Sequence, residues 1–388
     1  MRCTLGDGND LVFETVGTSE AFDALAAAGW DELVRAMPRP SPFLLHGWLA
    51  AWWRHEGDGA ELAVQVARRD GRLVAALPLC VRRSNGLRVA SFLGGVHSAL
   101  ADLLVASAEP ASTQVALAER VSSVRCDLAD LFGLPGDSRL AGACGARLRT
   151  VERVEAPVLD LTPGWDAVYR AKTDSKKRNL HKRRRRQLGE LGELDVVRAR
   201  TVDELDAALD EAFRLHELRW AGRPDGSGFV TPSGRRFNRD ALRALAAQGL
   251  ARIVLLRVDG RAVAFHYFLV FENRMYVYRL GFDPALGRLS PGLVNTLDAL
   301  EWAGEEGVER VEYLGGGERY KLELSDRLEP LYQGLGLAAT PQGHAVVGAR
   351  LAAIHVRRRL KRSPALHRLY FDRLAPIRRA VARAKPGN

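Results

Sequence analysis

The chain has 388 residues, which is enough for two domains of ordinary size. Its hydrophobic content of 47% is normal for a globular protein, and no apolar run reaches the length that a membrane span needs. The N-terminus lacks a signal-peptide pattern and the four cysteines lack paired zinc-ligand spacing, so we expect a cytoplasmic protein that binds no metal.

The net charge of +10 is unevenly distributed along the chain. Residues 171–187 contain nine Lys or Arg and one Asp, and residues 350–388 contain twelve Lys or Arg and one Asp. These two segments carry net charges of +8 and +11, which sum to +19. Because the whole chain carries +10, the remaining residues carry −9. The pattern therefore indicates a mildly acidic body with two basic segments, and it does not favour a nucleic-acid-binding protein as a whole.

The first 60 residues predict helices. Residues 18–37 are mostly helical in pattern, with Gly29 as a potential interruption, and two prolines follow. Trp48 and Trp52 are four residues apart and therefore share one helical face. This spacing favours packing against a sheet over stacking on a ligand.

Two hairpins are predicted, at residues 62–81 and 253–270, each with an Asp-Gly pair at its turn. Residues 68–75 match residues 257–264 at six of eight positions, at an offset of 189. The match is modest support for an internal duplication.

Further strands are expected at residues 101–106, 128–134 and 156–161. The basic segment 172–191 then predicts a helix with Ser175 as its cap. Its charges fit a groove wall for a phosphate, a nucleic acid or an acidic glycan, and they fit equally a solvated helix face.

The next helix begins at a capping-box pattern, Thr201 to Glu204. His216 lies on its apolar stripe, which favours a packed histidine over a base. The glycine-rich loop 222–228 that follows could close over an acceptor or be a plain connection. Candidate acceptor-binding residues at this helix end are His216, Arg219 and Trp220.

The segment 273–322 is the most informative part of the chain. It reads as a strand at residues 275–280, a loop, a helix opened by Ser290-Pro291, a strand at residues 308–314 and three glycines. A loop that opens a helix can hold phosphate, because the first helical amides are free and the helix dipole favours an anion.

The sequences FDPALGRLSPG and VEYLGGGERYK in this segment resemble the C-terminal acetyltransferase domain of CelD/BcsL-type (BioF-like) GNAT proteins. Those proteins resemble the peptidoglycan-bridge aminoacyltransferases in carrying two GNAT-like halves. The resemblance implies an α/β fold with two tandem GNAT-like halves, whose mixed, largely antiparallel sheets are flanked by helices. We expect an N-terminal half at residues 1–160 without donor binding, a catalytic half at 161–345 and a basic tail at 346–388.

The resemblance also implies a coenzyme A donor whose pyrophosphate lies at the loop before the helix. The loop departs from the usual superfamily form, with Ser-Pro where a glycine is expected. Candidate donor-binding residues are Tyr278, Leu280, Gly281, Arg288, Leu289, Ser290, Gly292 and Leu293.

We expect direct transfer of an acyl group, acetyl or longer, from the CoA thioester to an amine, because no nucleophile motif such as G-x-S-x-G is present. Glu312 or His266 is the candidate base, although His266 is equally compatible with a core histidine. Tyr320 could protonate the leaving thiolate, and Lys321 could stabilise its charge. By resemblance, the amine belongs to an amino sugar or an envelope-polysaccharide precursor.

Two other functions stay open. One is an aminoacyl-tRNA-dependent transferase that uses the basic helix to hold RNA, and the other is a non-catalytic protein that binds nucleic acid or an acidic polymer. The tail 350–388 alternates basic and apolar residues, which fits contact with a membrane surface or an anionic polymer, or packing on the body.

Overall fold

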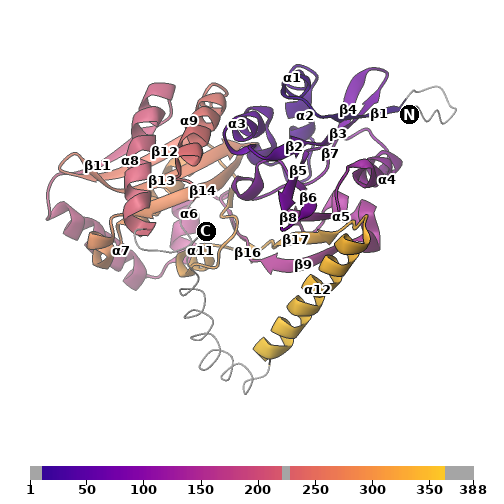
Figure 1. Ribbon diagram of the computed structural model, residues 1–388. Helices are drawn as coiled ribbons and strands as arrows, with labels where there is room; N and C mark the ends of the chain where they lie inside the picture. The colour runs from indigo at the N-terminus through magenta and orange to yellow at the C-terminus, as the bar shows by residue number, and fades with distance from the viewer. Residues whose placement is uncertain (1–10, 221–227, 363–388) are drawn as a thin grey trace.

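The computed structural model describes residues 11–220 and 228–362 (Figure 1). The chain forms mixed sheets flanked by helices, which confirms the predicted α/β class. Two sheets lie in the N-terminal half, and a seven-stranded sheet forms the core of the C-terminal half.

The strands are ordered as follows in the three sheets. The four-stranded sheet has the order β1 (Leu11–Val16), β3 (Val64–Arg69), β4 (Arg72–Leu77), β7 (Leu104–Val105). The six-stranded sheet has the order β2 (Ala60–Leu62), β5 (Leu79–Ser84), β6 (Leu87–Phe92), β8 (Leu128–Pro135), β17 (Leu331–Gly336), β9 (Leu148–Val154). The seven-stranded sheet has the order β11 (Leu194–Ala199), β12 (Ala251–Val258), β13 (Arg261–Phe271), β14 (Arg274–Phe282), β15 (Arg310–Glu312), β10 (Pro157–Asp160), β16 (Arg327–Leu328).

The α-helices cover the sheets on both sides. Those of the N-terminal half are α1 (Ser19–Asp23), α2 (Trp30–Arg35), α3 (His46–Glu56), α4 (Ala111–Glu119) and α5 (Arg139–Cys144). The remaining helices are α6 (Trp165–Lys172), α7 (Ser175–Gly189), α8 (Val202–Trp220), α9 (Pro232–Ala246), α10 (Pro291–Glu305), α11 (Arg319–Glu323) and α12 (Pro341–Arg362). The single helix predicted for residues 18–37 is two helices, because Gly29 has φ +95° and starts α2.

Strand β13 shows how the C-terminal sheet is buried on both faces. Phe265 and Tyr267 belong to the large core cluster that includes residues of α8 and α9. Phe268 belongs instead to the cluster beneath α10, with Trp302. Because side chains alternate along a strand, a run without polar interruption is expected for a strand covered on both sides.

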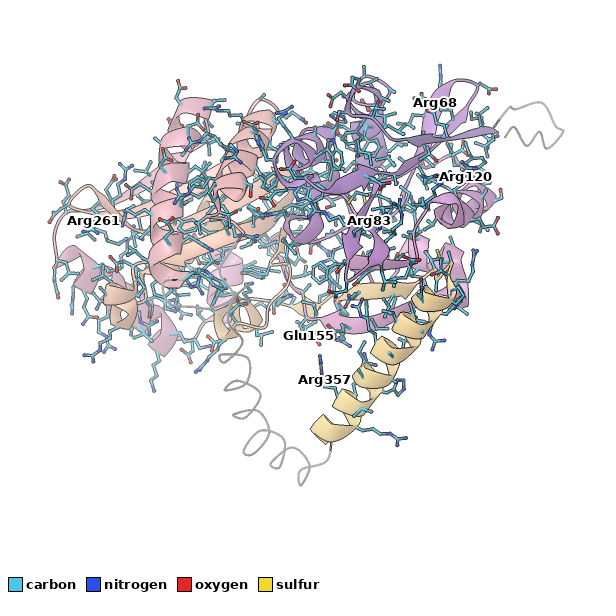
Figure 2. The ribbon with its side chains drawn as sticks, viewed as in Figure 1. Arg68, Arg83, Arg120, Glu155, Arg261 and Arg357 are labelled. Carbon is cyan, nitrogen blue, oxygen red and sulfur yellow. The ribbon has the colours of Figure 1, made fainter. Side chains whose placement is uncertain are left out.

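The two predicted hairpins are confirmed, and they share an irregularity. Both turns have positive φ at Asp and Gly, at residues 70–71 and 259–260. The β3–β4 register shifts between Ala67 and Arg68, and the β12–β13 register shifts between Leu256 and Arg257. These positions are 189 residues apart, the same offset as the sequence match, which strengthens the case for a duplication. The hairpins lie at opposite ends of the molecule, as Arg68 and Arg261 mark in Figure 2.

The two halves interlock through strands and helices. Strand β17 comes late in the chain but lies between β8 and β9 of the N-terminal half. Strand β10 pairs with β15 in the C-terminal sheet. Helix α3 packs on α9, and Asp240 of α9 accepts from His55 Nε2 at 2.7 Å. The division of the chain at residues 160 and 345 stays a prediction.

Helix α12 begins before the predicted basic tail and packs on the N-terminal half. Val346, Leu351 and Ile354 contact the apolar cluster formed by β8, β9 and β17. Arg350 donates to Asp130 at 2.7 Å. The rest of the tail, residues 363–388, lies outside the described residues. None of the helices within the described ranges is long and apolar enough to cross a membrane.

A buried ion-pair network fixes the centre of the C-terminal sheet. Glu312, at the end of β15, has no exposed surface. It accepts two hydrogen bonds from Arg39, at 3.1 Å (Nε to Oε1) and 2.5 Å (Nη2 to Oε2). Arg310 Nε donates to Glu312 Oε1 at 2.8 Å. The hydroxyl of Tyr276, the β14 residue paired with Glu312, donates to the Pro40 carbonyl. Residues 39 and 40 of the N-terminal half are thus tied to both strands.

We expect Glu312→Gln to lower the free energy of unfolding by about 3–5 kcal/mol, because it leaves the buried guanidinium groups of Arg39 and Arg310 to share the carboxylate of Glu329. Urea unfolding followed by circular dichroism measures this change. The matched control is Glu272→Gln, whose partner Arg35 and own side chain are each 42% exposed, so its effect should stay within about 1 kcal/mol. Equal stability of the two variants would contradict a structural role for Glu312.

Candidate active site

Strands β14 and β15 diverge after a short parallel pairing. They pair only from Arg274 to Tyr276 on β14, although the sequence predicted a strand over residues 308–314 beside it. Beyond Glu312 the chain leaves the sheet, while β14 continues to Phe282. Its register with β13 shifts so that Tyr278 is an extra residue, a β-bulge. The fork therefore opens beside a strand edge whose polar groups have lost their β15 partner.

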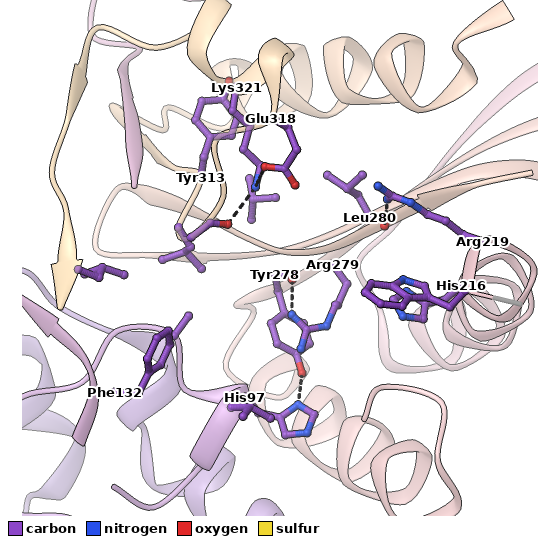
Figure 3. A pocket seen from close by; sticks show the side chains of 17 residues that line it. His97, Phe132, His216, Arg219, Tyr278, Arg279, Leu280, Tyr313, Glu318 and Lys321 are labelled. Carbon is purple, nitrogen blue, oxygen red and sulfur yellow. Dashed lines mark hydrogen bonds and ion pairs between the residues drawn. The ribbon is translucent and has the colours of Figure 1, made fainter. Parts of the chain in front are cut away.

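A cavity of about 390 Å³ occupies this fork, at the boundary between the two halves (Figure 3). One wall is β14 and the opposite wall is the segment 313–321. Side chains of α8 and of the N-terminal half close the remaining sides. The polar residues that line it are His97, His216, Arg219, Tyr278, Arg279, Tyr313, Glu318 and Lys321.

Tyr278 of β14 and His97 of the N-terminal half connect the two halves within the cavity wall. The Tyr278 hydroxyl and His97 Nδ1 share a hydrogen bond of 2.8 Å. Burial and then the charge of Arg279 lower the pKa of His97 to about 3, and burial raises the pKa of Tyr278 to about 12. Both side chains are therefore neutral at pH 7, and the pair positions the wall without carrying charge.

The opposite wall carries a buried lysine. Lys321, on the short helix α11, donates to the Gly315 carbonyl at 3.2 Å and pairs with Glu318 at 3.0 Å. Its side chain is 7% exposed, whereas that of Glu318 is 50% exposed. The structure thus places Lys321 in the cavity, as the sequence predicted for a catalytic residue, and adds Glu318 beside it.

The three predicted acceptor-binding residues also meet at the cavity. His216 and Trp220 stack with ring centroids 5.7 Å apart. Burial, followed by the charges of Arg279 and Arg219, lowers the pKa of His216 to about 4. Arg219 donates to the Leu280 carbonyl at 3.1 Å. The loop that follows, residues 221–227, lies outside the described residues.

The predicted donor loop forms a 3₁₀ turn, Pro284–Leu289, before α10. Pro291 occupies the first turn of α10 as predicted, but the expected Ser290 cap is wrong. Ser290 has φ +53°, and its side chain makes no capping hydrogen bond, because the left-handed conformation directs it away from the helical amides. Arg288 is exposed, and no ion pair with a carboxylate is found for it among the described residues.

Two glycines near this loop are required by packing. A Cβ at Gly292 would lie 2.9 Å from the Phe282 ring, and a Cβ at Gly281 would lie 2.5 Å from the Phe265 ring. Leu289 contacts the small apolar cluster around Leu188 and Val294. The Phe282 ring therefore fills the space beside Gly292, and packing alone explains why a glycine is needed there.

Other predicted residues lie outside the main cavity. Tyr320 and Leu293 meet at a smaller pocket with Lys177 and His181 of α7. Glu312 is held in its arginine network, and His266 is 1% exposed beneath α10, with burial and the charge of Lys321 lowering its pKa to about 3. The structure therefore does not bring either candidate base, Glu312 or His266, to the cavity.

The basic helix α7 lies beside the donor loop. It contacts the turn before α10, and Arg185 pairs with Asp298 of α10 at 2.6 Å. The expected Ser175 cap is wrong, because Asp174 accepts from the Lys177 amide at 2.6 Å. Asp174 therefore occupies the N-cap position and Ser175 begins the helix. Within the described ranges, no group of three or more His, Cys, Asp or Glu side chains could hold a metal ion.

Sequence reasoning missed His97, Arg279 and Glu318. His97 is 181 residues from Tyr278 and carries no local signal. Arg279 follows the bulged Tyr278, and a bulge cannot be read from a strand pattern alone. Glu318 did have a signal, since it stands between three glycines and Tyr320-Lys321.

The buried His97 predicts a pH-dependent stability. Its pKa is about 3 in the folded protein and near 6.5 when unfolded, so below pH 6.5 the unfolded chain binds more protons. The contribution of neutral His97 to the free energy of unfolding is fully present above pH 6.5 and is lost as the pH falls toward 3. We expect His97 to account for about 2 kcal/mol of the stability lost between pH 7.5 and 5.

Urea unfolding of His97→Gln at several pH values measures this share, because the variant should show a flatter dependence than the wild type. His344→Gln is the control, since His344 is exposed on α12 and should leave the slope unchanged. Parallel curves for wild type and His97→Gln would contradict the assignment.

A family model matches part of the C-terminal half. Residues 175–322 match the family model described as an acetyltransferase (GNAT) domain. Comparison with curated proteins gives no match.

Several solved structures share the fold over most of the chain. FemX has a TM-score of 0.59 at 11% identity, covering 86% of this chain and 100% of FemX. A conserved protein of unknown function from Bacteroides thetaiotaomicron has a TM-score of 0.54 at 16% identity, covering 84% and 99%. The C-terminal domain of a putative lysylphosphatidylglycerol synthetase from Agrobacterium fabrum has a TM-score of 0.51 at 14% identity, covering 86% and 96%. The domain match supports an N-acyltransferase, and the solved structures show that the fold is shared.

Proposed function

We propose that the protein transfers an acyl group from acyl-coenzyme A to an amine by direct attack. The observation that carries this proposal is the fork of β14 and β15, which opens onto a cavity with Lys321 and Glu318 on one wall. Acetyl-CoA is the donor that the matched domain suggests. The narrower CelD/BcsL type rests on the sequence resemblance.

The donor would lie along the free edge of β14. Its phosphates would meet Arg288 and the Gly292 amide at the start of α10, where the helix dipole favours an anion. Pro291 has no N–H, and the Leu293 and Val294 amides donate to the Ser290 carbonyl. The donor's thioester would then reach the bulge at Tyr278, which lies four residues before the end of β14 at Phe282. A bulged residue is left out of the ladder, so its N–H is a candidate donor to the developing oxyanion.

The cavity walls supply groups for the proton transfers. We assign Glu318 to accept the proton from the attacking ammonium, because it is the carboxylate that lines the cavity. Lys321 would stabilise the leaving thiolate. His97 and His216 are weaker candidates for the base because both are packed into the wall, where His97 is hydrogen-bonded to Tyr278 and His216 is stacked on Trp220.

Aminoacyl-tRNA is the alternative donor. The observation that favours it is the position of α7, whose exposed Lys182, Arg183 and Arg186 flank the donor loop. Release of free thiol from acetyl-CoA on addition of an amine supports our proposal, and activity that requires aminoacyl-tRNA supports the alternative. An acceptor such as an amino-sugar precursor, and contact of residues 350–388 with an anionic surface, remain parts of the proposal for a cytoplasmic, membrane-peripheral enzyme.

Arg288→Glu should weaken coenzyme A binding about tenfold, because it replaces a cation beside the phosphates with an anion. Isothermal titration calorimetry with coenzyme A measures the change. Arg72→Glu is the matched control, an exposed arginine at the β3–β4 hairpin of the N-terminal half, and it should bind as the wild type does. Arg288 is a cleaner test than Gly292→Asp, which would collide with Phe282. Unchanged affinity in Arg288→Glu would exclude the donor loop.

Lys321→Met should lower turnover about a hundredfold with little change in coenzyme A affinity, because the lysine acts on charge that develops in the transition state. Methionine keeps most of the buried stem. Arg319→Met is the control on the same helix, since its side chain is 90% exposed and pairs with Glu323. Thiol release at saturating donor is the measurement. If turnover is retained, Lys321 is structural, and if only affinity falls, it binds the donor.

A further inference from the structure

The geometry points to an anion-binding subsite for the acceptor, formed by Arg279 and Arg219 on the α8 side of the cavity. We infer that the acceptor carries a carboxylate or phosphate group near its amine. This inference rests on the proposed function and names its substrate class.

Arg279 is held in the cavity wall by contacts with the preceding residue. Its guanidinium carbon lies 4.2 Å from the Tyr278 ring centroid, and Nη1 donates to the Tyr278 carbonyl at 2.9 Å. No ion pair between Arg279 and a carboxylate is found among the described residues, whereas the partly buried Arg252 and Arg310 each pair with a glutamate. A guanidinium has five N–H donors, so most of those on Arg279 remain for a ligand.

Arg219 repeats this arrangement on the neighbouring helix. It donates to the Leu280 carbonyl at 3.1 Å, and its guanidinium carbon lies 5.5 Å from the Phe282 ring centroid. Within the described residues it too has no carboxylate partner. Arg219 from the helix and Arg279 from the strand line the same cavity as the buried His216, and their charges contribute to the lowered pKa of that histidine. That histidine is neutral at pH 7 and adds no charge of its own.

The charges of the cavity are therefore unbalanced. Its lining includes three cations, Arg219, Arg279 and Lys321, and one carboxylate, Glu318, which is already paired with Lys321. The result is a net charge of +2 concentrated around β14 and α8. A partly desolvated site of this kind binds an oxyanion well, because planar guanidinium groups match carboxylate and phosphate oxygens.

The position of this charge suits the acceptor. Arg279 stands near His97 and Phe229, at the side covered by α8 and the N-terminal half. The proposed donor phosphates lie at the start of α10, on the opposite face of the sheet. An acceptor with an anion at the arginines and an ammonium toward Glu318 would match the cavity at both ends.

Two pairs of probes test the inference, each with and without an anion: glucosamine 6-phosphate against glucosamine, and alanine against alaninamide. Thiol release from saturating acetyl-CoA gives kcat/KM for each amine. We expect the wild type to prefer at least one anionic member by tenfold or more. Arg279→Met and Arg219→Met should each reduce that preference about tenfold, through a rise in KM that is larger for the anionic amine than for its neutral partner.

Arg236→Met is the matched control, because Arg236 is exposed on α9 and lies outside the cavity lining, so it should keep the preference. Urea unfolding checks that each variant is folded. Equal kcat/KM for both members of each pair would overturn the inference. An equal loss with charged and neutral amines would also overturn it, since the arginines would then act on the donor or the reaction.

Calorimetric binding of the same four amines to the donor-free protein separates this inference from the proposed function. If no amine is acylated but an anionic probe binds and Arg279→Met abolishes binding, the anion site stands and the acyl transfer fails. If neutral amines are acylated and no anionic probe binds more tightly than its partner, the acyl transfer stands and the anion site fails. The phosphate and carboxylate pairs show which anion the site takes.

Discussion

The buried carboxylate of Glu312 is the constraint on which the fork depends. It is the last residue of β15 to pair with β14, and it is enclosed by Arg39 and Arg310. Removing several charges from water is costly, and only the mutual attraction within the network offsets that cost. The network is further neutralised by Glu329, whose pKa is raised by burial but lowered more strongly by Arg310 and Arg327, to about 2.

This anchor explains why the cavity lies where the two halves meet. Arg39 belongs to the N-terminal half, so its ion pair with Glu312 fixes that half to the point at which the strands part. The Tyr278–His97 hydrogen bond makes a second connection two residues beyond the pairing on β14. A fork held at its base and open beyond it leaves strand polar groups free for a ligand. Neither half alone supplies a closed cavity.

The elements that sequence predicted well are those set by local physics. The Asp-Gly turns require positive φ, and Pro291 fits only the first turn of a helix, so both can be read from a few neighbouring residues. Ser290 shows the limit of such rules, because the same residue type suits a cap and a left-handed turn. Its conformation is decided by how the loop joins β14 to α10.

The site residues that sequence reasoning placed differently are those decided by distant contacts. Glu312 has a carboxylate that could act as a base, but that carboxylate is bound by Arg39, which is 273 residues away in sequence. His266 lies on a strand that alternation alone cannot orient when both faces are covered. Lys321 was identified because the glycines before it signal a backbone turn at a strand end. The glycine turn therefore pointed to a residue of the cavity wall, whereas residue type alone pointed to Glu312 and His266, which do not line the cavity.

The duplicated hairpin suggests how the two halves came to differ. In each half, the strand that pairs with the second hairpin strand is followed by a helix and another strand, as β7–α4–β8 and as β14–α10–β15, although β5 and β6 intervene between β4 and β7. In the C-terminal half the two strands belong to one sheet and part only after three residue pairs. In the N-terminal half, β7 and β8 lie in separate sheets, so no fork forms between them. The chain between β6 and β7 instead provides His97, which closes the other half's cavity. The C-terminal half then carries the proposed site while the N-terminal half completes its wall, and β17 joins the two by crossing back between β8 and β9.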